Sequence, residues 1–236
     1  MKIGLFSDPH YCLSQDVGGD RRSALSYEKI RAAMSEFKKA GANICFCLGD
    51  LTDTPEGSTK ETTKENLKNI MELINSFGIP FYLVVGNHDY LTLNSEDFKK
   101  ENIDTPPYII ETKEYNFVTL DANYRSNMER FDTAGVVWDD SNLPPEQCEF
   151  LKNALANSQK ECIVLVHENL DPTVHYQHII KNHEDVRKII SDSGRVKMVI
   201  QGHYHEGSYQ VIDNIPYLTV KGMCQGEENH YMILDI

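Results

Sequence analysis

The sequence has no apolar run that approaches the ~18 residues of a membrane-spanning helix, so it predicts no transmembrane segment. Its first residues, MKIGLFSD, enter a strand-like run without the apolar stretch and cleavage site of a signal peptide. The six cysteines include no C-x-x-C pair, and they do not resemble the disulfide framework of a small secreted domain. Together these absences predict a reduced, cytoplasmic protein.

Positive charge is scarce, because 23 Lys and Arg residues face 36 Asp and Glu residues and the net charge is −13. Surfaces that bind nucleic acids or anionic membranes carry clustered Lys and Arg, so the sequence argues against both partners. A nuclease with a short substrate channel would escape this test. If the substrate is an anion, bound cations must attract it.

The chain also lacks a Gly/Ser- or Pro-rich linker and an internal repeat, so we expect one domain over residues 1–236. Apolar residues at helical spacing predict helices over residues 23–40, 59–77, 144–157 and 182–192. Continuous apolar runs predict buried strands at residues 3–6, 44–48, 81–85, 117–120, 162–166 and 196–200. Three more strand-like runs, at residues 209–212, 215–220 and 231–236, predict an antiparallel section at the C-terminal end. Strands that alternate with helices indicate an α/β protein.

Five of the predicted strands end in side chains that can bind metals. In chain order, the residues that follow them are Ser7-Asp8-Pro9-His10, Gly49-Asp50-Leu51-Thr52-Asp53, Gly86-Asn87-His88-Asp89, His167 and Gln201-Gly202-His203-Tyr204-His205. Each of these segments alone would be an ordinary turn. Because ligands of α/β sheets bind outside the carboxyl ends of the strands, five such ends predict one common pocket.

The residue types in these segments suit divalent metals. Carboxylate and amide oxygens with imidazole nitrogens bind Mn, Fe, Zn and related ions, which the sequence does not separate further. Asp8 and His10 are two residues apart, so in an extended segment their side chains point to the same side. A central carboxylate such as Asp50 can bridge two ions about 3.5–4 Å apart, and such a pair can activate a water molecule and neutralise a phosphate. We therefore expect two divalent metal ions.

This order of motifs, from Asp8 to His205, resembles the calcineurin-like metallophosphoesterase superfamily. The resemblance implies a four-layer α/β/β/α sandwich, with two mixed β-sheets flanked by helices and a dimetal site at the strand ends. It implies two groups of ligands and one bridge: Asp8, His10 and His205 for one metal, Asn87, His167 and His203 for the other, and Asp50 between them. Within the superfamily, the arrangement resembles the small bacterial phosphodiesterases and nucleoside-diphosphate-linked hydrolases more than the large Ser/Thr protein phosphatases. A weaker likeness, in the segment from Arg21 to Asp50 and in residues 202–207, points to the manganese-dependent ADP-ribose/CDP-alcohol diphosphatases.

The resemblance also implies a mechanism. A metal-bridging hydroxide attacks the phosphorus of a phosphodiester or diphosphate, His88 contacts the phosphate and protonates the leaving oxygen, and Asp53 orients His88. The protein is then a metal-dependent phosphohydrolase of the phosphodiesterase, phosphatase or nucleoside-diphosphate-linked hydrolase class. A phosphomonoesterase with the same metal core is the nearest alternative, and a non-catalytic binding module is a second one.

The expected partner is a small phosphorylated molecule, with nucleotides among the candidates. Residues near the ligand-bearing loops are candidate substrate contacts: Tyr90, Asn123, Arg125 and His175, together with Tyr11 and His178. Arg125 could hold a second phosphate with two guanidinium nitrogens. For each residue taken alone, an ordinary solvated side chain is the stronger interpretation. The sequence makes no prediction of the oligomeric state.

Overall fold

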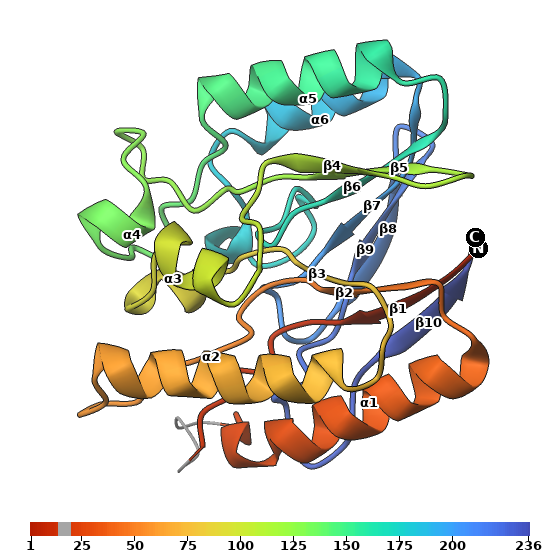
Figure 1. The fold of residues 1–236 in the computed structure, drawn as a ribbon. Helices are drawn as coiled ribbons and strands as arrows, with labels where there is room; N and C mark the ends of the chain where they lie inside the picture. The colour runs from red at the N-terminus through yellow and green to blue at the C-terminus, as the bar shows by residue number, and fades with distance from the viewer. Residues whose placement is uncertain (14–19) are drawn as a thin grey trace.

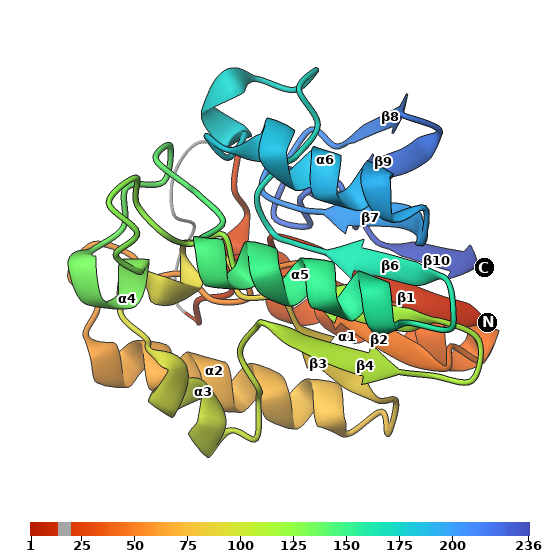
Figure 2. The same ribbon diagram turned by 90° about the horizontal axis from the view of Figure 1, so that it is seen from above.

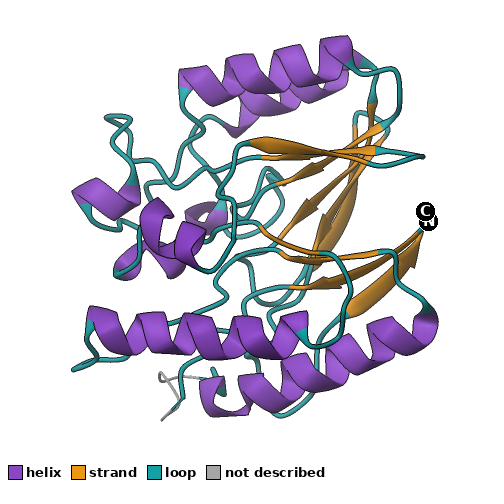
Figure 3. Cartoon of the chain, in the orientation of Figure 1, coloured by secondary structure: helices purple, strands orange, loops and turns teal. Residues whose placement is uncertain are grey.

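The computed structural model describes residues 1–13 and 20–236, which form four layers (Figure 1). Two sheets pack face to face, and helices cover the outer face of each (Figure 3). Helices α1 (Ser26–Ala40) and α2 (Lys60–Asn75) cover the first sheet. Helices α5 (Pro145–Asn157) and α6 (His183–Ser193) cover the second. The predicted α/β/β/α sandwich is therefore confirmed.

The first sheet contains four strands of the described chain in the order β10-β1-β2-β3. Their bounds are β1 Lys2–Phe6, β2 Ile44–Cys47, β3 Phe81–Leu83 and β10 Met232–Asp235. Strands β1, β2 and β3 are parallel, and β10 runs antiparallel to β1, so the sheet is mixed. The final strand of the chain thus returns to lie beside the first.

The second sheet contains six described strands in the order β4-β5-β6-β7-β9-β8. Their bounds are β4 Tyr108–Glu111, β5 Asn116–Thr119, β6 Cys162–Leu165, β7 Val196–Gln201, β8 Ser208–Ile212 and β9 Ile215–Thr219. The four central strands are parallel, and the edge strands β4 and β8 are antiparallel to their neighbours. The β8–β9 hairpin confirms the predicted antiparallel section, but β10 leaves it for the other sheet.

The continuous apolar runs reflect burial on both faces of each sheet. In β2, Ile44 and Phe46 point between the two sheets, whereas Cys45 and Cys47 point toward α1 and α2. Both cysteines are free thiols that pack as small apolar side chains. In β1, a Cβ atom on Gly4 would collide with the ring of Phe37, so this glycine allows α1 to approach the sheet closely.

The four predicted helices are present with slightly different ends. Residues 23–25 form a separate 3₁₀ turn before α1, and the Thr59 hydroxyl caps α2 by accepting a hydrogen bond from the Thr62 N–H at 3.2 Å. Two short helices, α3 (Ser95–Lys100) and α4 (Phe131–Ala134), and the strand β4 were not predicted. Within the described residues, no helix combines the length and the apolar character that a membrane span requires.

Figures 1 and 2 show that both chain termini lie at one end of the sandwich. The parallel strands start near this end and run toward the opposite one, where α3, α4 and the long connections gather. The carboxyl ends of parallel strands from both sheets therefore meet at a single edge of the molecule.

Candidate metal centre

The structure brings the seven predicted ligands together from both sheets. Asp8, His10 and Asp50 have ligand atoms within 4.8 Å of one another, and so do Asp50, His167 and His203. The other two predicted ligands adjoin these groups, because His205 Nε2 lies 3.1 Å from His10 Nε2 and Asn87 Oδ1 lies 3.3 Å from His167 Nε2. The two groups share Asp50.

Four of the predicted ligands have left-handed backbone conformations. Their φ angles are +51° for Asp8, +49° for His10, +52° for Asp50 and +64° for His203. Such angles are uncommon for residues other than glycine, and they often occur at functional sites. Here each one turns the chain sharply after a strand, so that the following side chains face the common pocket.

The glycines before three of the ligands have two different roles. Gly49, with φ +105°, needs the conformational freedom of glycine. Close approach requires glycine at all three positions, because a Cβ atom would overlap the His167 ring at Gly49, the Asp50 carboxylate at Gly86 and the Ser7 hydroxyl at Gly202. The chain segments around the ligands are therefore packed too tightly for side chains at these positions.

The first ligand group combines a carboxylate with two imidazoles. Asp8 is fully buried, and its Oδ1 atom lies 3.3 Å from His205 Nε2. Its Oδ2 atom accepts hydrogen bonds from the Ser7 hydroxyl and, at 3.1 Å, from the His203 N–H. Burial opposes the charged form of Asp8, but the imidazoles of His205 and His167 together outweigh burial and lower the pKa of Asp8 to about 2. Asp8 is therefore anionic at neutral pH, as a ligand of a cation would be.

The second ligand group contains Asn87, His167 and His203. His167 Nδ1 donates to the Leu48 carbonyl at 2.6 Å, which leaves Nε2 as the free lone pair that faces the pocket. Asn87 Oδ1 lies near the same nitrogen. His203 Nε2 is buried and has no hydrogen-bond partner among the described residues. A buried nitrogen without a partner is costly unless it binds something else, which is what a metal ligand does.

Asp50 occupies the position that a bridging ligand requires. Its Oδ2 atom lies 3.5 Å from His10 Nε2 in the first group and 3.5 Å from His167 Nε2 in the second. Its Oδ1 atom accepts the His88 N–H at 2.8 Å, which fixes the orientation of the carboxylate. Burial opposes ionisation of Asp50, but the surrounding imidazoles, His167 first among them, hold its pKa well below the usual value.

Asp53 holds two histidines at once. Its Oδ1 atom accepts a hydrogen bond from His88 Nδ1 at 3.0 Å, and its Oδ2 atom accepts one from His10 Nδ1 at 2.9 Å. Arg21 Nη1 lies 3.3 Å from Oδ2. The sequence analysis predicted the contact of Asp53 with His88 but not its contact with His10. A carboxylate behind a metal-binding imidazole fixes its tautomer and raises its basicity.

His88 lies at the mouth of the pocket, with its side chain 24% exposed. Burial lowers the pKa of His88, but the carboxylates of Asp50 and Asp53 outweigh burial and raise it overall. The neighbouring Asp89 does not line the metal pocket and has a structural role instead. Its carboxylate accepts the backbone N–H groups of Thr52 and Gly86, both at 2.9 Å, so it ties the loop together behind the pocket.

The arrangement fits a pair of divalent metal ions. The two groups supply carboxylate and amide oxygens and imidazole nitrogens, which are suitable ligands for Mn, Fe and Zn. Among the buried side-chain atoms of the described residues that lack a hydrogen-bond partner, two belong to predicted ligands and face the shared carboxylate region: Asp8 Oδ1 and His203 Nε2. These orphaned atoms and the shared Asp50 are explained together if two cations bind between them.

A cavity of about 280 Å³ opens at this centre, and we call it the metal pocket. It is lined by five predicted metal-site residues, one candidate substrate contact and four others: Asp50, Asn87, His88, His203 and His205, then His178, and Trp138, Tyr204, Glu206 and Gln225. Sequence reasoning missed Trp138. The only available signal was that it is the single tryptophan of the chain and that it lies in a long connection between strands.

The four favoured substrate contacts lie outside the described lining of the metal pocket. Tyr90 and Asn123 are buried, and both donate hydrogen bonds to Asp121, at 3.1 Å and 2.9 Å. Arg125 Nε donates to the Gly135 carbonyl at 3.0 Å, so it supports its own loop. His175 is exposed and its ring packs on Tyr176. Of the wider set of candidates, His178 lines the pocket.

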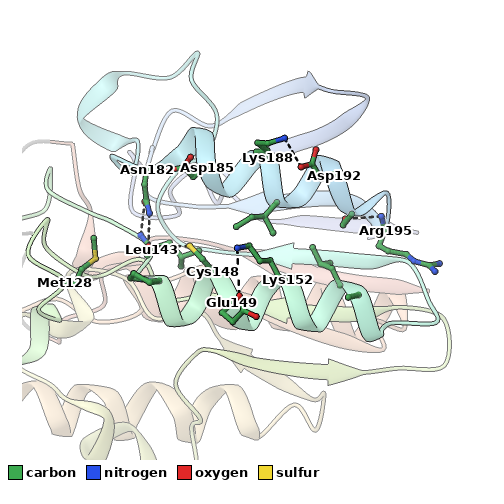
Figure 4. Close-up of a pocket in the computed structure, with 15 residues that line it drawn as sticks. Met128, Leu143, Cys148, Glu149, Lys152, Asn182, Asp185, Lys188, Asp192 and Arg195 are labelled. Carbon is green, nitrogen blue, oxygen red and sulfur yellow. Dashed lines mark hydrogen bonds and ion pairs between the residues drawn. The ribbon is translucent and has the colours of Figure 1, made fainter.

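A larger cavity, of about 1070 Å³, lies between α5 and α6 and contains none of the predicted site residues (Figure 4). Two of its lysines are paired with acidic residues on the same helix, because Lys188 Nζ lies 2.8 Å from Asp192 Oδ2 and Lys152 Nζ lies 4.0 Å from Glu149 Oε2. The predicted metal-binding and catalytic side chains that line a cavity therefore line the smaller metal pocket.

Comparison with known proteins agrees with this geometry. The family model of the calcineurin-like phosphoesterases matches residues 1–207. The chain is 23% identical over 167 residues to a Coxiella burnetii protein named "Probable cyclic nucleotide phosphodiesterase", a match that covers 69% of this chain and 60% of that protein. It is 20% identical over 212 residues to the 3',5'-cyclic adenosine monophosphate phosphodiesterase of Haemophilus influenzae, covering 87% of this chain and 70% of the relative. The chain thus spans less than two thirds of the Coxiella protein.

Among solved structures, the fold is similar to that of a dimetal phosphatase from Danio rerio. The TM-score is 0.82 at 16% sequence identity, and the alignment covers 98% of this chain and 91% of the other. At this identity the likeness shows the shared fold alone.

Proposed function

The chain belongs to the calcineurin-like phosphoesterase family, and from this premise we propose that it hydrolyses a phosphodiester or diphosphate bond with the help of two divalent metal ions. The observation that carries the proposal is Asp50, whose Oδ2 atom lies 3.5 Å from an imidazole nitrogen of each ligand group. Both sheets supply ligands, which supports one catalytic domain over residues 1–236.

Asp8, His10 and His205 would hold one ion, Asn87, His167 and His203 would hold the other, and Asp50 would touch both. When bound, the ions supply a water molecule of lowered pKa and neutralise the charge of the phosphate. The protein fixes the geometry beforehand, because Asp53, the Leu48 carbonyl and the His88 N–H orient His10, His167 and Asp50, respectively. This preorganisation lowers the cost of placing charge on the phosphate in the transition state.

His88 is the proposed general acid. Its Nδ1–H donates to Asp53 Oδ1, so the opposite ring nitrogen, Nε2, is left for the substrate. In the protonated ring Nε2 can donate a proton to the leaving oxygen, and the neighbouring carboxylates favour this form. Asp53 is a positioning residue, since it acts on the substrate only through the imidazoles that it holds.

The names of the relatives support a cyclic nucleotide as the first substrate to test. The free thiols of Cys45, Cys47 and Cys162 support a reducing compartment such as the cytoplasm. Mn, Fe and Zn all suit the nitrogen and oxygen ligands, so Mn²⁺ is the practical choice for the first assays.

The test compares hydrolysis of bis(para-nitrophenyl) phosphate and para-nitrophenyl phosphate by Mn²⁺-loaded protein. We expect diester turnover, lowered about 10²–10⁴-fold by His88→Ala with the metal content unchanged. His183→Ala, at the start of α6, is the matched control and should leave turnover unchanged. Monoester turnover alone would instead identify a phosphomonoesterase, and metal loss in the His88 variant would make His88 a ligand.

A further inference from the structure

The metal pocket has an aromatic wall, formed by Trp138, His178 and Tyr204, that the proposed metal chemistry does not use. The ring centroid of His178 lies 5.5 Å from that of Trp138 and 5.2 Å from that of Tyr204. The wall adjoins the metal ligand His203, whose ring centroid is 4.9 Å from His178 and 6.1 Å from Trp138. Three residues from three separate connections thus meet beside the second ligand group.

Trp138 is 40% exposed, although tryptophan is the side chain that gains most from burial. Its loop is held in place, because the Asp140 carboxylate accepts the Ser126 N–H at 3.1 Å and the Asp140 N–H donates to the Val137 carbonyl at 2.8 Å. The indole is therefore presented at the pocket by an ordered turn. A rigid, partly exposed aromatic side chain loses little entropy when it binds a ligand.

The rest of the pocket is polar. Glu206 and Gln225 line it together with the imidazoles and carboxylate of the metal centre. A ligand whose phosphate lies at the metals therefore meets a polar surface in one direction and aromatic rings in another. Ring faces pack best against another planar π-system, and aromatic side chains stack on nucleobases in this way.

We propose that Trp138, supported by His178, is a stacking subsite for the planar base of a nucleotide substrate. This inference rests on the proposed function, since it assumes that the phosphate of the substrate binds at the metal centre. It assigns the choice of substrate to a residue that contacts neither the metals nor the reacting phosphate. The alternative is a purely structural role, in which Trp138 packs on His178 and stabilises its loop without contacting a ligand.

Trp138 is the single tryptophan of the chain, so tryptophan fluorescence reports this residue directly. Mn²⁺-loaded protein would be titrated with AMP and with ribose 5-phosphate, which carries the phosphate and the sugar but lacks the base. We expect AMP to quench the emission and ribose 5-phosphate to leave it nearly unchanged. AMP that binds by calorimetry without changing the emission would overturn the proposal.

Substitution separates stacking from a structural role. Trp138→Leu should weaken AMP binding about tenfold, and ribose 5-phosphate binding less than about twofold, with the Mn²⁺ content unchanged. Trp138→Phe should restore most of the affinity for AMP. Tyr209→Leu is the matched control, because Tyr209 is a 60% exposed aromatic residue on the edge strand β8.

The outcomes distinguish this inference from the proposed function. Equal losses for AMP and ribose 5-phosphate would overturn the stacking subsite, whether or not the protein hydrolyses phosphodiesters. A selective loss for AMP would support it even if diester turnover were absent, because both probes are phosphate monoesters and need only bind.

Discussion

The two sheets make different contributions to the metal centre. The ends of the first sheet supply its two predicted anionic ligands, Asp8 and Asp50, together with Asp53 behind them. The ends of β6 and β7 in the second sheet supply only imidazoles: His167, His203 and His205. The connections of the second sheet also carry Trp138 and His178, which form the aromatic wall.

This difference indicates a division of labour. The first sheet supplies the charge that attracts the cations and the His88–Asp53 pair that we propose for proton transfer. The second sheet would complete the proposed coordination with imidazoles, and it contributes most of the surface that we propose for the substrate base. Asp50, from the first sheet, joins the two sets, so the packing between the sheets determines the geometry of the centre.

The largest effect should follow from removing the bridge. Asp50→Asn retains the size of the side chain but loses its charge at the point that the two ligand groups share. We expect a loss of activity of about a thousandfold or more and weaker binding of both ions, measured by turnover and by elemental analysis after dialysis. Asp97→Asn, at a buried carboxyl on the short helix α3 outside the metal pocket, should retain both ions. Two tightly bound ions in the Asp50 variant would exclude the bridge.

The next effect concerns the packing between the sheets. Phe46 lies between them, with its ring centroid 4.9 Å from that of Phe117, whereas Phe37 packs between the first sheet and α1. Both are fully buried, so Phe46→Ala and Phe37→Ala should each lower the free energy of unfolding by about 3–5 kcal/mol, measured by urea denaturation of chelator-treated protein.

Of these two variants, only Phe46→Ala should also weaken metal binding beyond its effect on folding. The reason is that Phe46 separates the two sheets that carry the ligands, while Phe37 supports an outer layer. The affinities for Mn²⁺ would be compared under conditions in which both variants remain folded. Equal affinities would mean that each sheet positions its ligands independently of the other.

The sequence predicted the features of this molecule that depend on local pattern. Buried strands need continuous apolar runs and amphipathic helices need apolar residues at a helical spacing, so both are visible in a single segment. The convergence of the predicted ligands could be expected for a related reason: strands of both sheets end at one edge, and polar residues follow them there. The family resemblance then supplied the grouping of Asp8 with His205 and of Asn87 with His203.

The features that were missed depend on contacts between distant residues. The strand β4 has four residues and only Ile110 is buried, so its apolar pattern is too short to recognise. The strand β10 was predicted, but its pairing with β1 joins residues more than two hundred positions apart. Trp138 gains its position from the ring of His178, forty residues later, and nothing in its own loop indicates the metal pocket.

The smallest expected effect concerns the hydrogen-bond partners that orient the histidines of the site. In the first sheet, Asp53 accepts hydrogen bonds from both His10 and His88, and one Asn side chain cannot accept both in the same way. Asp53→Asn should therefore lower kcat/KM and the affinity for Mn²⁺, each about 10–100-fold. Gln225→Leu removes only an uncharged neighbour of His205, 3.0 Å from Nδ1, and should have a smaller effect on Mn²⁺ affinity.

A double-mutant cycle with His88→Ala separates the two roles of Asp53. If Asp53 acts through His88 alone, Asp53→Asn should have no further effect once His88 is absent. The contact with His10 predicts instead that the loss of Mn²⁺ affinity persists in the His88→Ala background, while the loss of kcat disappears. A retained Mn²⁺ affinity in the double variant would show that the carboxylate behind His10 is dispensable. Support by a carboxylate would then no longer distinguish His10, which follows the first sheet, from His167, which follows the second and donates to the Leu48 carbonyl.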